Sequence, residues 1–316
     1  MHRASGQGDF SELLVVGGGN ARLERIEQMI DWKPIEAALA GVYASPTGRP
    51  SFAPLCMFKI LLLQHWYGIG DPETEEMVGD RLSFRRFAGM GYGERVPDHS
   101  TICRFRNELL RDNLGEKLFA LVGEQLAQRG FVLKVGTLID ATLIKPAAAE
   151  PPKQKGGGCS RADPDAKWTK RPNGTAHFGY KLHVAVDQGS TIVRAARLTP
   201  ANVNEVVVGH ELVQGDEQAV WADKGYVGPA LRERLARSGI KNRVQRKASR
   251  VRKLTRWETL RNVLIARRRG RIEGVFGALK RSYGLARLRY MGLARNTVSV
   301  LLTLTAWNLS RASAIA

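Results

Sequence analysis

The chain has 316 residues, of which 43% are hydrophobic and 25% charged, the proportions of an ordinary globular protein with a sizeable core. Its formal net charge of +19 and isoelectric point near 10.3 indicate a polyanionic partner. Nucleic acid is favoured over an acidic membrane surface, because the basic residues are spread over separate segments and no apolar run reaches the roughly 18 residues of a spanning helix.

The expected compartment is the cytoplasm, with the protein associated with the nucleoid. The first nine residues are polar and contain no apolar signal core. Cys56, Cys103 and Cys159 are an odd, scattered set without C-x-x-C spacing. Cys56 and Cys103 lie in helical patterns, which favours buried thiols and fits a reducing environment.

Residues 1–129 are predicted to form an all-helical N-terminal domain. The segment Ala53–Tyr67 is apolar nearly all round, which indicates a helix buried on most sides. Proline and acidic residues at Pro72–Glu76 are typical of a first helical turn. The other predicted helices are Leu23–Leu39, interrupted by Pro34, together with Leu82–Gly89 and Leu114–Gln128.

The segment Val96–Arg106 predicts a capped basic helix. Asp98 or Ser100 can cap it, and one face carries three apolar side chains, Ile102, Phe105 and Leu109. Arg104 and Arg106 project from other faces and are candidate DNA contacts. Short helices ending in a capped basic helix resemble a helix-turn-helix module. A plain helical bundle with a solvated basic face explains the spacing equally well.

After Gly130 the pattern becomes α/β. Residues 145–174 are rich in Pro, Gly and Lys and are predicted to be a loop. Predicted strands are Phe131–Asp140, His177–Asp187, Thr191–Leu198, Ala219–Asp223 and Asn242–Gln245, the second and third forming a hairpin. Predicted helices run from Asn202 or Asn204 to Leu212, then over Pro229–Ser238, Trp257–Tyr283 and Thr297–Ala312.

Three carboxylates are candidate metal ligands. Asp140 and Asp223 each close an apolar run, and Glu273 lies in the basic run 267–273. Reactive groups gather beyond the carboxyl ends of strands in α/β sheets, and a buried carboxylate costs desolvation energy unless it is partnered. Three converging carboxylates would hold divalent cations against a phosphate backbone. Taken singly, each aspartate is better explained as a loop cap and Glu273 as a surface salt-bridge partner. Together with the basic charge and the α/β order, the three carboxylates favour a site.

The predicted helix around Glu273 has a charged edge. At about 100° per residue, Arg269, Glu273 and Lys280 fall within a stripe roughly 40° wide. The core stripe lies about 100° away by the same count and consists of Ile272, Val275 and Leu279. The acid would ligate metal, while the two cations would contact phosphate oxygens.

Other basic and aromatic residues are candidate DNA contacts. The tract 241–271 holds thirteen Lys or Arg against one acid, Glu258, so it supplies +12 of the charge and is predicted to be a basic, DNA-tracking insertion. Lys224 and Tyr226 directly follow Asp223 and are candidate phosphate contacts. His177 and His183 share a strand face six residues apart, which favours structural or phosphate-facing roles over one metal site.

These motifs together resemble the DDE motifs of bacterial insertion-sequence transposases. The matching segments are Leu138–Thr142, Ala222–Tyr226 and Arg269-x3-Glu273-x6-Lys280. Pro97–Arg106 looks like the N-terminal signature of the insertion-sequence-five (IS-five) type. His177–Asp187 and Leu198–Asn202 resemble that family's second and third strands. The resemblance spans about residues 50–309.

The resemblance implies an RNase H-like catalytic domain over 130–316, a mixed sheet flanked by helices. It also implies that Asp140, Asp223 and Glu273 bind two Mg²⁺ ions, for which Mn²⁺ could substitute. The implied activity is cleavage at the ends of a mobile element and joining of the freed 3′-hydroxyl to target DNA, within a homo-oligomeric complex on double-stranded DNA. The related group with a Tyr-x2-Arg-x3-Glu-x6-Lys signature has tyrosine where this chain has Ala266, so no role for that tyrosine carries over.

Two other functions fit the same residues. One is a metal-dependent nuclease that cleaves DNA without joining it. The other is a non-catalytic DNA-binding protein derived from a transposase, although the intact carboxylates argue against it.

Overall fold

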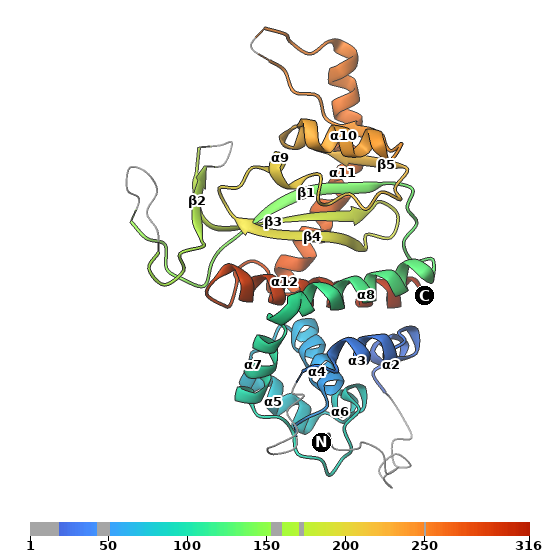
Figure 1. Ribbon diagram of the computed structural model, residues 1–316, viewed down its shortest axis with the longest axis vertical. Helices are drawn as coiled ribbons and strands as arrows, with labels where there is room; N and C mark the ends of the chain where they lie inside the picture. The colour runs from blue at the N-terminus through green and yellow to red at the C-terminus, as the bar shows by residue number, and fades with distance from the viewer. Residues whose placement is uncertain (1–18, 43–50, 153–159, 171–173, 250) are drawn as a thin grey trace. The chain divides into compact units, whose positions relative to one another are not determined.

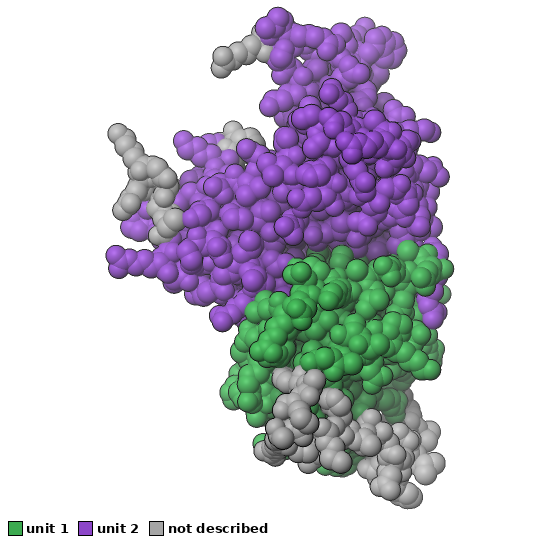
Figure 2. All heavy atoms as spheres, viewed as in Figure 1, with its two compact units in different colours: residues 1–128, 301–316 green, residues 129–300 purple. Residues whose placement is uncertain are grey.

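The computed structural model describes residues 19–42, 51–152, 160–170, 174–249 and 251–316 (Figure 1). The chain divides into two compact units, which Figure 2 colours separately. Unit 1 comprises residues 1–128 and 301–316, and unit 2 comprises residues 129–300. The sequence assigned all of 130–316 to one domain, whereas residues 301–316 group with the N-terminal helices. The indole of Trp66 donates to the carbonyl oxygen of Ala306 at 2.6 Å, which ties that segment to unit 1.

Unit 1 is all-helical, as predicted. Its core element is α4 (Pro54–Tyr67), whose side chains are buried from Met57 through Trp66, because its sequence is apolar on nearly every face. The other elements are α2 (Ala21–Met29), α3 (Lys33–Leu39), α5 (Asp71–Asp80), α6 (Leu82–Ala88), α7 (His99–Glu108), η1 (Arg111–Asn113) and α8 (Leu114–Gln128).

The predicted helix Leu23–Leu39 is two helices. Helix α2 ends at Met29 and α3 begins at Lys33, with Pro34 in the first turn of α3. Proline fits there because its missing N–H would have no partner in a first turn, whereas inside a continuous helix its ring would clash with the preceding turn.

Helix α7 begins as predicted. Asp98 is its N-cap, and the carboxylate accepts from the Thr101 N–H at 2.7 Å. The predicted apolar face is buried in unit 1, with Ile102, Phe105 and Leu109 fully enclosed. This face fixes the direction in which the remaining side chains of α7 point.

Unit 2 is built on a six-stranded mixed sheet. The order is β2-β3-β1-β5-β6, with β4 paired to β3. Strands β2, β3 and β4 join antiparallel, whereas β1 pairs parallel with β5 and β5 with β6. The strands are β1 (Thr137–Ile144), β2 (Lys167–Lys170), β3 (Ala176–Asp187), β4 (Val193–Pro200), β5 (Ala219–Ala222) and β6 (Lys241–Val244).

The first strand lies further along the chain than predicted. The prediction placed it at Phe131–Asp140 with Asp140 at its end, but β1 runs from Thr137 to Ile144, so Asp140 lies inside it. Lys134 has a left-handed backbone with φ of 56°, which an extended strand cannot contain. Residues 141–144 continue the strand because they pair with β3.

Two other predicted segments differ in extent. The predicted loop 145–174 contains β2, which pairs with β3. The predicted helix ending at Leu212 is a single turn, α9 (Glu205–Val208), followed by further turns. The hairpin joining β3 to β4 forms as predicted.

The two faces of the sheet are covered by different helices (Figure 1). On one face, Val220 and Ala222 of β5 pack with Leu231 and Leu235 of α10 (Pro229–Arg237). Side chains alternate along a strand, so the intervening residues Trp221 and Asp223 face the other way, toward α11 (Arg256–Ser282). The last helix, α12 (Leu293–Ile315), follows.

The fold is the predicted α/β class, a mixed sheet flanked by helices and preceded by a helical N-terminal region. In the part of the chain that the structure describes, no helix is long and apolar enough to cross a bilayer.

Candidate active site

The sheet register places two aspartates side by side. In the parallel pairing of β1 with β5, Ile139 lies opposite Ala222, and this is the last pair of the ladder. The next residues are Asp140 on β1 and Asp223 directly after β5. Parallel neighbours bring these positions to the same level of the sheet, so the two aspartates are adjacent although Asp140 is not at the end of its strand.

Asp223 is held by the turn that follows it. It is the N-cap of η2 (Lys224–Tyr226), and its carboxylate accepts from the Gly225 N–H. One carboxylate oxygen is therefore fixed by the backbone, as expected where a strand turns sharply into a helical turn.

Helix α11 brings the charged stripe to the same face. A guanidinium N–H of Arg269 donates to the Asp140 carboxylate, and the ammonium of Lys280 donates to the carbonyl oxygen of Leu143 at 3.0 Å. Glu273 lies between them on α11 and is exposed. The core stripe is buried as predicted, through Ile272, Val275 and Leu279.

The three carboxylates interact electrostatically. Burial raises the pKa of Asp140 to about 6, and the guanidinium of Arg269 opposes this rise. The negative charges of Asp223 and Glu273 raise the same pKa further. Clustered like charges disfavour ionisation of one member, so the site concentrates negative charge that a cation would relieve.

Within the described ranges, no group of three or more His, Cys, Asp or Glu side chains is arranged to hold a metal ion. The donor chemistry nevertheless suits a hard divalent cation, since carboxylate oxygens are its preferred ligands. The guanidinium of Arg269 forms an ion pair with one carboxylate oxygen of Asp140, so a metal ion that binds this oxygen would have to displace the guanidinium.

Two family models match the chain. One, described as a transposase domain (DUF772), matches residues 16–108. The other, described as a transposase DDE domain, matches residues 133–309, which is more than half of the chain. The chain belongs to the DDE transposase family. Its DDE match covers all three carboxylates of the site.

One solved structure that the chain matches is described as the cryo-EM structure of a piggyBac transposase synaptic complex with hairpin DNA. The two chains are 12% identical, with a TM-score of 0.42. The similarity covers 93% of this chain and 74% of the other.

A partly buried polar cluster beside Asp223 was not predicted. The ammonium of Lys181 on β3 contacts the Glu205 carboxylate at 2.8 Å and the carbonyl oxygen of Val203 at 2.8 Å. Glu205 extends toward Gly225, where its carboxylate lies 3.6 Å from the position of an added Cβ. Lys181 shares the strand face of His177 and His183 by alternation along β3, but no spacing rule links it to a glutamate 24 residues later.

Tyr226 is enclosed in this transposase instead of facing DNA. Only 1% of it is exposed, and its hydroxyl lies 3.4 Å from Nδ1 of His183, whose Nε2 lies 3.2 Å from the Thr199 hydroxyl. Burial raises the pKa of Tyr226 and lowers that of His183 to about 4. The predicted phosphate contact through Tyr226 is therefore corrected to a core role. Lys224 is exposed.

The two predicted DNA contacts on α7 have different environments. Arg104 is exposed and donates to the carbonyl oxygen of Ser100 and to the Thr101 hydroxyl. Arg106 is only 4% exposed, forms an ion pair with Asp71 and donates to the Gln64 side chain at 2.9 Å. Because its guanidinium is engaged inside unit 1, the prediction that Arg106 contacts DNA is corrected.

The described part of the basic tract 241–271 consists of β6, residues 245–249 and 251–255, and the N-terminal part of α11. Its acid, Glu258, is used within the tract. Together with Thr255 it caps α11, and it forms ion pairs with Arg246 at 2.6 Å and Arg252 at 2.7 Å. Of the tract's other described cations, Arg261 and Arg269 are half-buried and the rest are exposed.

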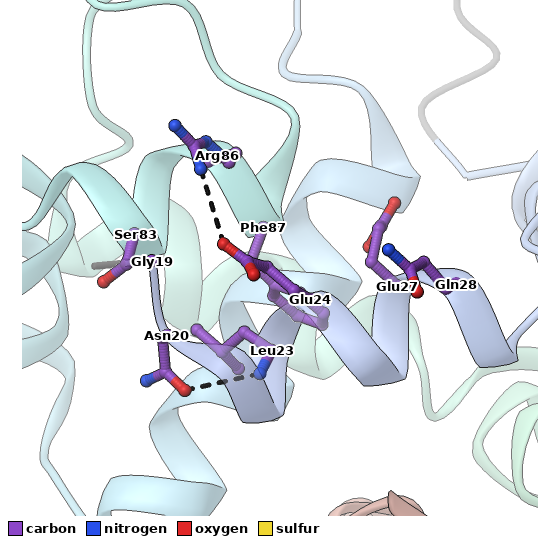
Figure 3. A pocket seen from close by; sticks show the side chains of 9 residues that line it. All are labelled: Gly19, Asn20, Leu23, Glu24, Glu27, Gln28, Ser83, Arg86 and Phe87. Atoms are coloured by element: carbon purple, nitrogen blue, oxygen red, sulfur yellow. Dashed lines mark hydrogen bonds and ion pairs between the residues drawn. The ribbon is translucent and has the colours of Figure 1, made fainter. Parts of the chain in front are cut away.

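Unit 1 also contains a pocket, lined by residues of α2 and α6 and the residues just before α2. None of the three carboxylates lines it. Figure 3 shows its lining, which includes the apolar side chains of Leu23 and Phe87. Its cavity volume is about 140 Å³. Glu24 on its wall forms an ion pair with Arg86 at 3.5 Å, so the charges there are partnered within the chain.

Proposed function

We propose that this chain binds the ends of an insertion sequence, cleaves them and joins the 3′-hydroxyl to target DNA, with Asp140, Asp223 and Glu273 as the catalytic carboxylates. The observation that carries the proposal is the meeting of β1, β5 and α11. The register sets Asp140 beside Asp223, and the negative charge of Glu273 acts on Asp140.

The same three residues would hold divalent cations, with Mg²⁺ favoured by their oxygen donors. Bound there, a pair of cations would supply Lewis acidity for in-line displacement at phosphorus, favouring both attack by a hydroxyl and departure of the leaving oxygen.

Arg269 and Lys280 have a distinct role in the proposal. Arg269 balances the charge of Asp140, and both cations reach β1 from one side of α11. When a phosphate enters, these side chains lie where they can donate to its oxygens, because an arginine presents two parallel N–H groups to an oxyanion.

DNA is held by exposed cations outside the carboxylate cluster. Arg104 on α7 is proposed to contact element ends, and Lys224 the strand at the site, since both are exposed. The net charge of +19 suits a polyanion such as double-stranded DNA as the partner. In the proposed complex, a homo-oligomer holds the element ends and the target DNA together.

The test is a strand-transfer assay. A labelled duplex with a recessed element end and a free 3′-hydroxyl is incubated with plasmid DNA and Mg²⁺. The wild-type chain should covalently join the label to the plasmid, and Asp223→Ala should bind the duplex without joining it.

A matched control is Glu233→Ala, which removes an exposed carboxylate from α10. It should join DNA at the wild-type rate. Cleavage of an intact end without any joined product would favour the nuclease function, and binding without either reaction would favour a non-catalytic protein.

A further inference from the structure

The indole of Trp221 contacts two arginines, one from the edge strand β6 and one from α11. Trp221 lies on β5, opposite Arg243 of the edge strand β6. The guanidinium of Arg243 lies 5.8 Å from the centroid of the indole, and that of Arg268 on α11 lies 5.2 Å from it. Both distances are in the range of cation–π attraction, so the indole orients two cations from two different elements.

These two guanidiniums differ from the neighbouring cations of the tract. Arg261 donates to two carbonyl oxygens of β6, and Arg271 donates to the carbonyl oxygen of Gln188. Arg243 and Arg268 are exposed and, among the described residues, have neither an ion pair nor a hydrogen bond through their side chains. Their N–H groups are therefore oriented and available to a ligand.

The cluster lies next to the carboxylate site. Trp221 on β5 and Asp223 directly after it are two residues apart in extended backbone and face the same side of the sheet, the side that α11 covers, so their backbones are separated by about 7 Å. Arg268 precedes Arg269, the residue that contacts Asp140. A DNA strand with one phosphate at the carboxylates would bring neighbouring phosphates to these arginines.

The chemistry of the cluster favours phosphate over a nucleobase or an acidic side chain. Guanidiniums already lie against the indole, so it offers little surface for base stacking. Two planar forks from separate elements suit the several oxygens of a phosphodiester backbone.

We propose that Arg243 and Arg268, oriented by Trp221, form a phosphate-binding clamp that holds the backbone of the DNA strand beside the carboxylates. This inference rests on the proposed function, because it assumes that DNA is the substrate.

The test is duplex binding without divalent ions, measured by fluorescence anisotropy over a series of salt concentrations. Arg243→Gln and Arg268→Gln are compared with Arg237→Gln, which removes an exposed charge from α10 on the other face. Each clamp variant should bind about tenfold more weakly, and each should lower the slope of log affinity against log salt by about 0.9, the value for one lost phosphate contact. Arg237→Gln should change neither quantity by a comparable amount.

Two substitutions at Trp221 test the orientation without changing the charge. Trp221→Leu should weaken binding by about twofold to fivefold, the loss expected from a missing cation–π contact, while Trp221→Phe should retain most of the affinity. Thermal denaturation checks that each variant is folded, and the two arginine variants decide the matter if Trp221→Leu is not.

Because phosphates carry no base sequence, the losses should be equal on an element end and on a scrambled duplex. The clamp is refuted if both arginine variants bind like Arg237→Gln, or if affinity falls on the element end alone, which would indicate base reading. A wild-type chain that never cleaves or joins DNA, yet shows these binding losses, would refute the proposed function and leave the clamp standing.

Discussion

Arg104 and Arg106 are two residues apart on α7, and their surroundings assign them different roles. Replacing Arg106 with Gln removes the partner of Asp71 inside unit 1 and should destabilise that unit by about 3 kcal/mol, the cost of breaking a buried ion pair. Arg104→Gln should leave stability unchanged, because its side chain is exposed. Urea denaturation followed by circular dichroism measures both.

The DNA affinity of the Arg104→Gln variant is the second part of this prediction. Arg104→Gln should weaken binding to element-end duplex, as expected for a lost phosphate contact. Equal stability of the two variants would show that Arg106 is not structural.

His183 makes part of the stability acid-sensitive. Its pKa in the folded chain is about 4, below the ordinary value of 6.5, because burial and the charge of Lys181 disfavour the protonated ring. The unfolded chain therefore binds the proton first as pH falls. Stability is complete above about pH 6.5 and is lost as pH falls toward 4, by at most about 3 kcal/mol from this residue.

His183→Gln cannot titrate but can still hydrogen-bond Thr199 and Tyr226. Its unfolding free energy should fall less than that of the wild type between pH 6.5 and 4, as measured by urea titration at each pH. His99→Gln, which replaces an exposed histidine, should follow the wild type. A parallel decline in all three proteins would contradict the assignment.

For single residues, the sequence indicated which charged side chains are candidates for the site, but it did not indicate which side chains are buried. Asp140, Asp223 and Glu273 were identifiable because their neighbours along the chain are informative. The burial of Arg106 and Tyr226 was not, since it depends on Asp71 and His183, which lie 35 and 43 residues away.

Among the elements of the site, the bounds of α11 were predicted closely and those of β1 were not. A helical stripe is set by residues three and four apart, so the charged edge and the core stripe of α11 followed from the sequence. Strand limits depend on pairing partners, and β1 extends to Ile144 because β3 runs alongside it to Tyr180. The parallel pairing with β5 placed the aspartates together despite that shift.

Gly179 on β3 is required by the close approach of β1. Its φ is 142°, and an added Cβ would lie 2.3 Å from the carbonyl oxygen of Ile144. Gly179→Ala should therefore destabilise unit 2 by about 1–3 kcal/mol. Thermal or urea denaturation measures the loss.

The control for this change is Gly270→Ala on α11, where nothing lies within 4 Å of an added Cβ. Alanine favours a helix, so this variant should gain about 0.5–1 kcal/mol. A wild-type stability for Gly179→Ala would show that the strands can separate to admit the methyl group.

For the whole molecule, charge and composition predicted the class of partner, and the order of motifs predicted the family. The grouping of residues 301–316 with unit 1 was not predictable, because it depends on contacts such as that of Trp66 with Ala306, 240 residues apart. The insertion-sequence-five type stays a prediction from the motifs.

The central claim is that Asp140, Asp223 and Glu273 act as one catalytic centre. The most direct test is the rate of cleavage of saturating element-end duplex with Mg²⁺, for wild type, Asp140→Asn, Asp223→Asn and Glu273→Gln. Glu211→Gln, which changes an exposed carboxylate, is the control. Each of the three should lose about 10³-fold in rate while still binding DNA, and the control should match the wild type. Near-wild-type cleavage by any one of the three would contradict its place in the centre.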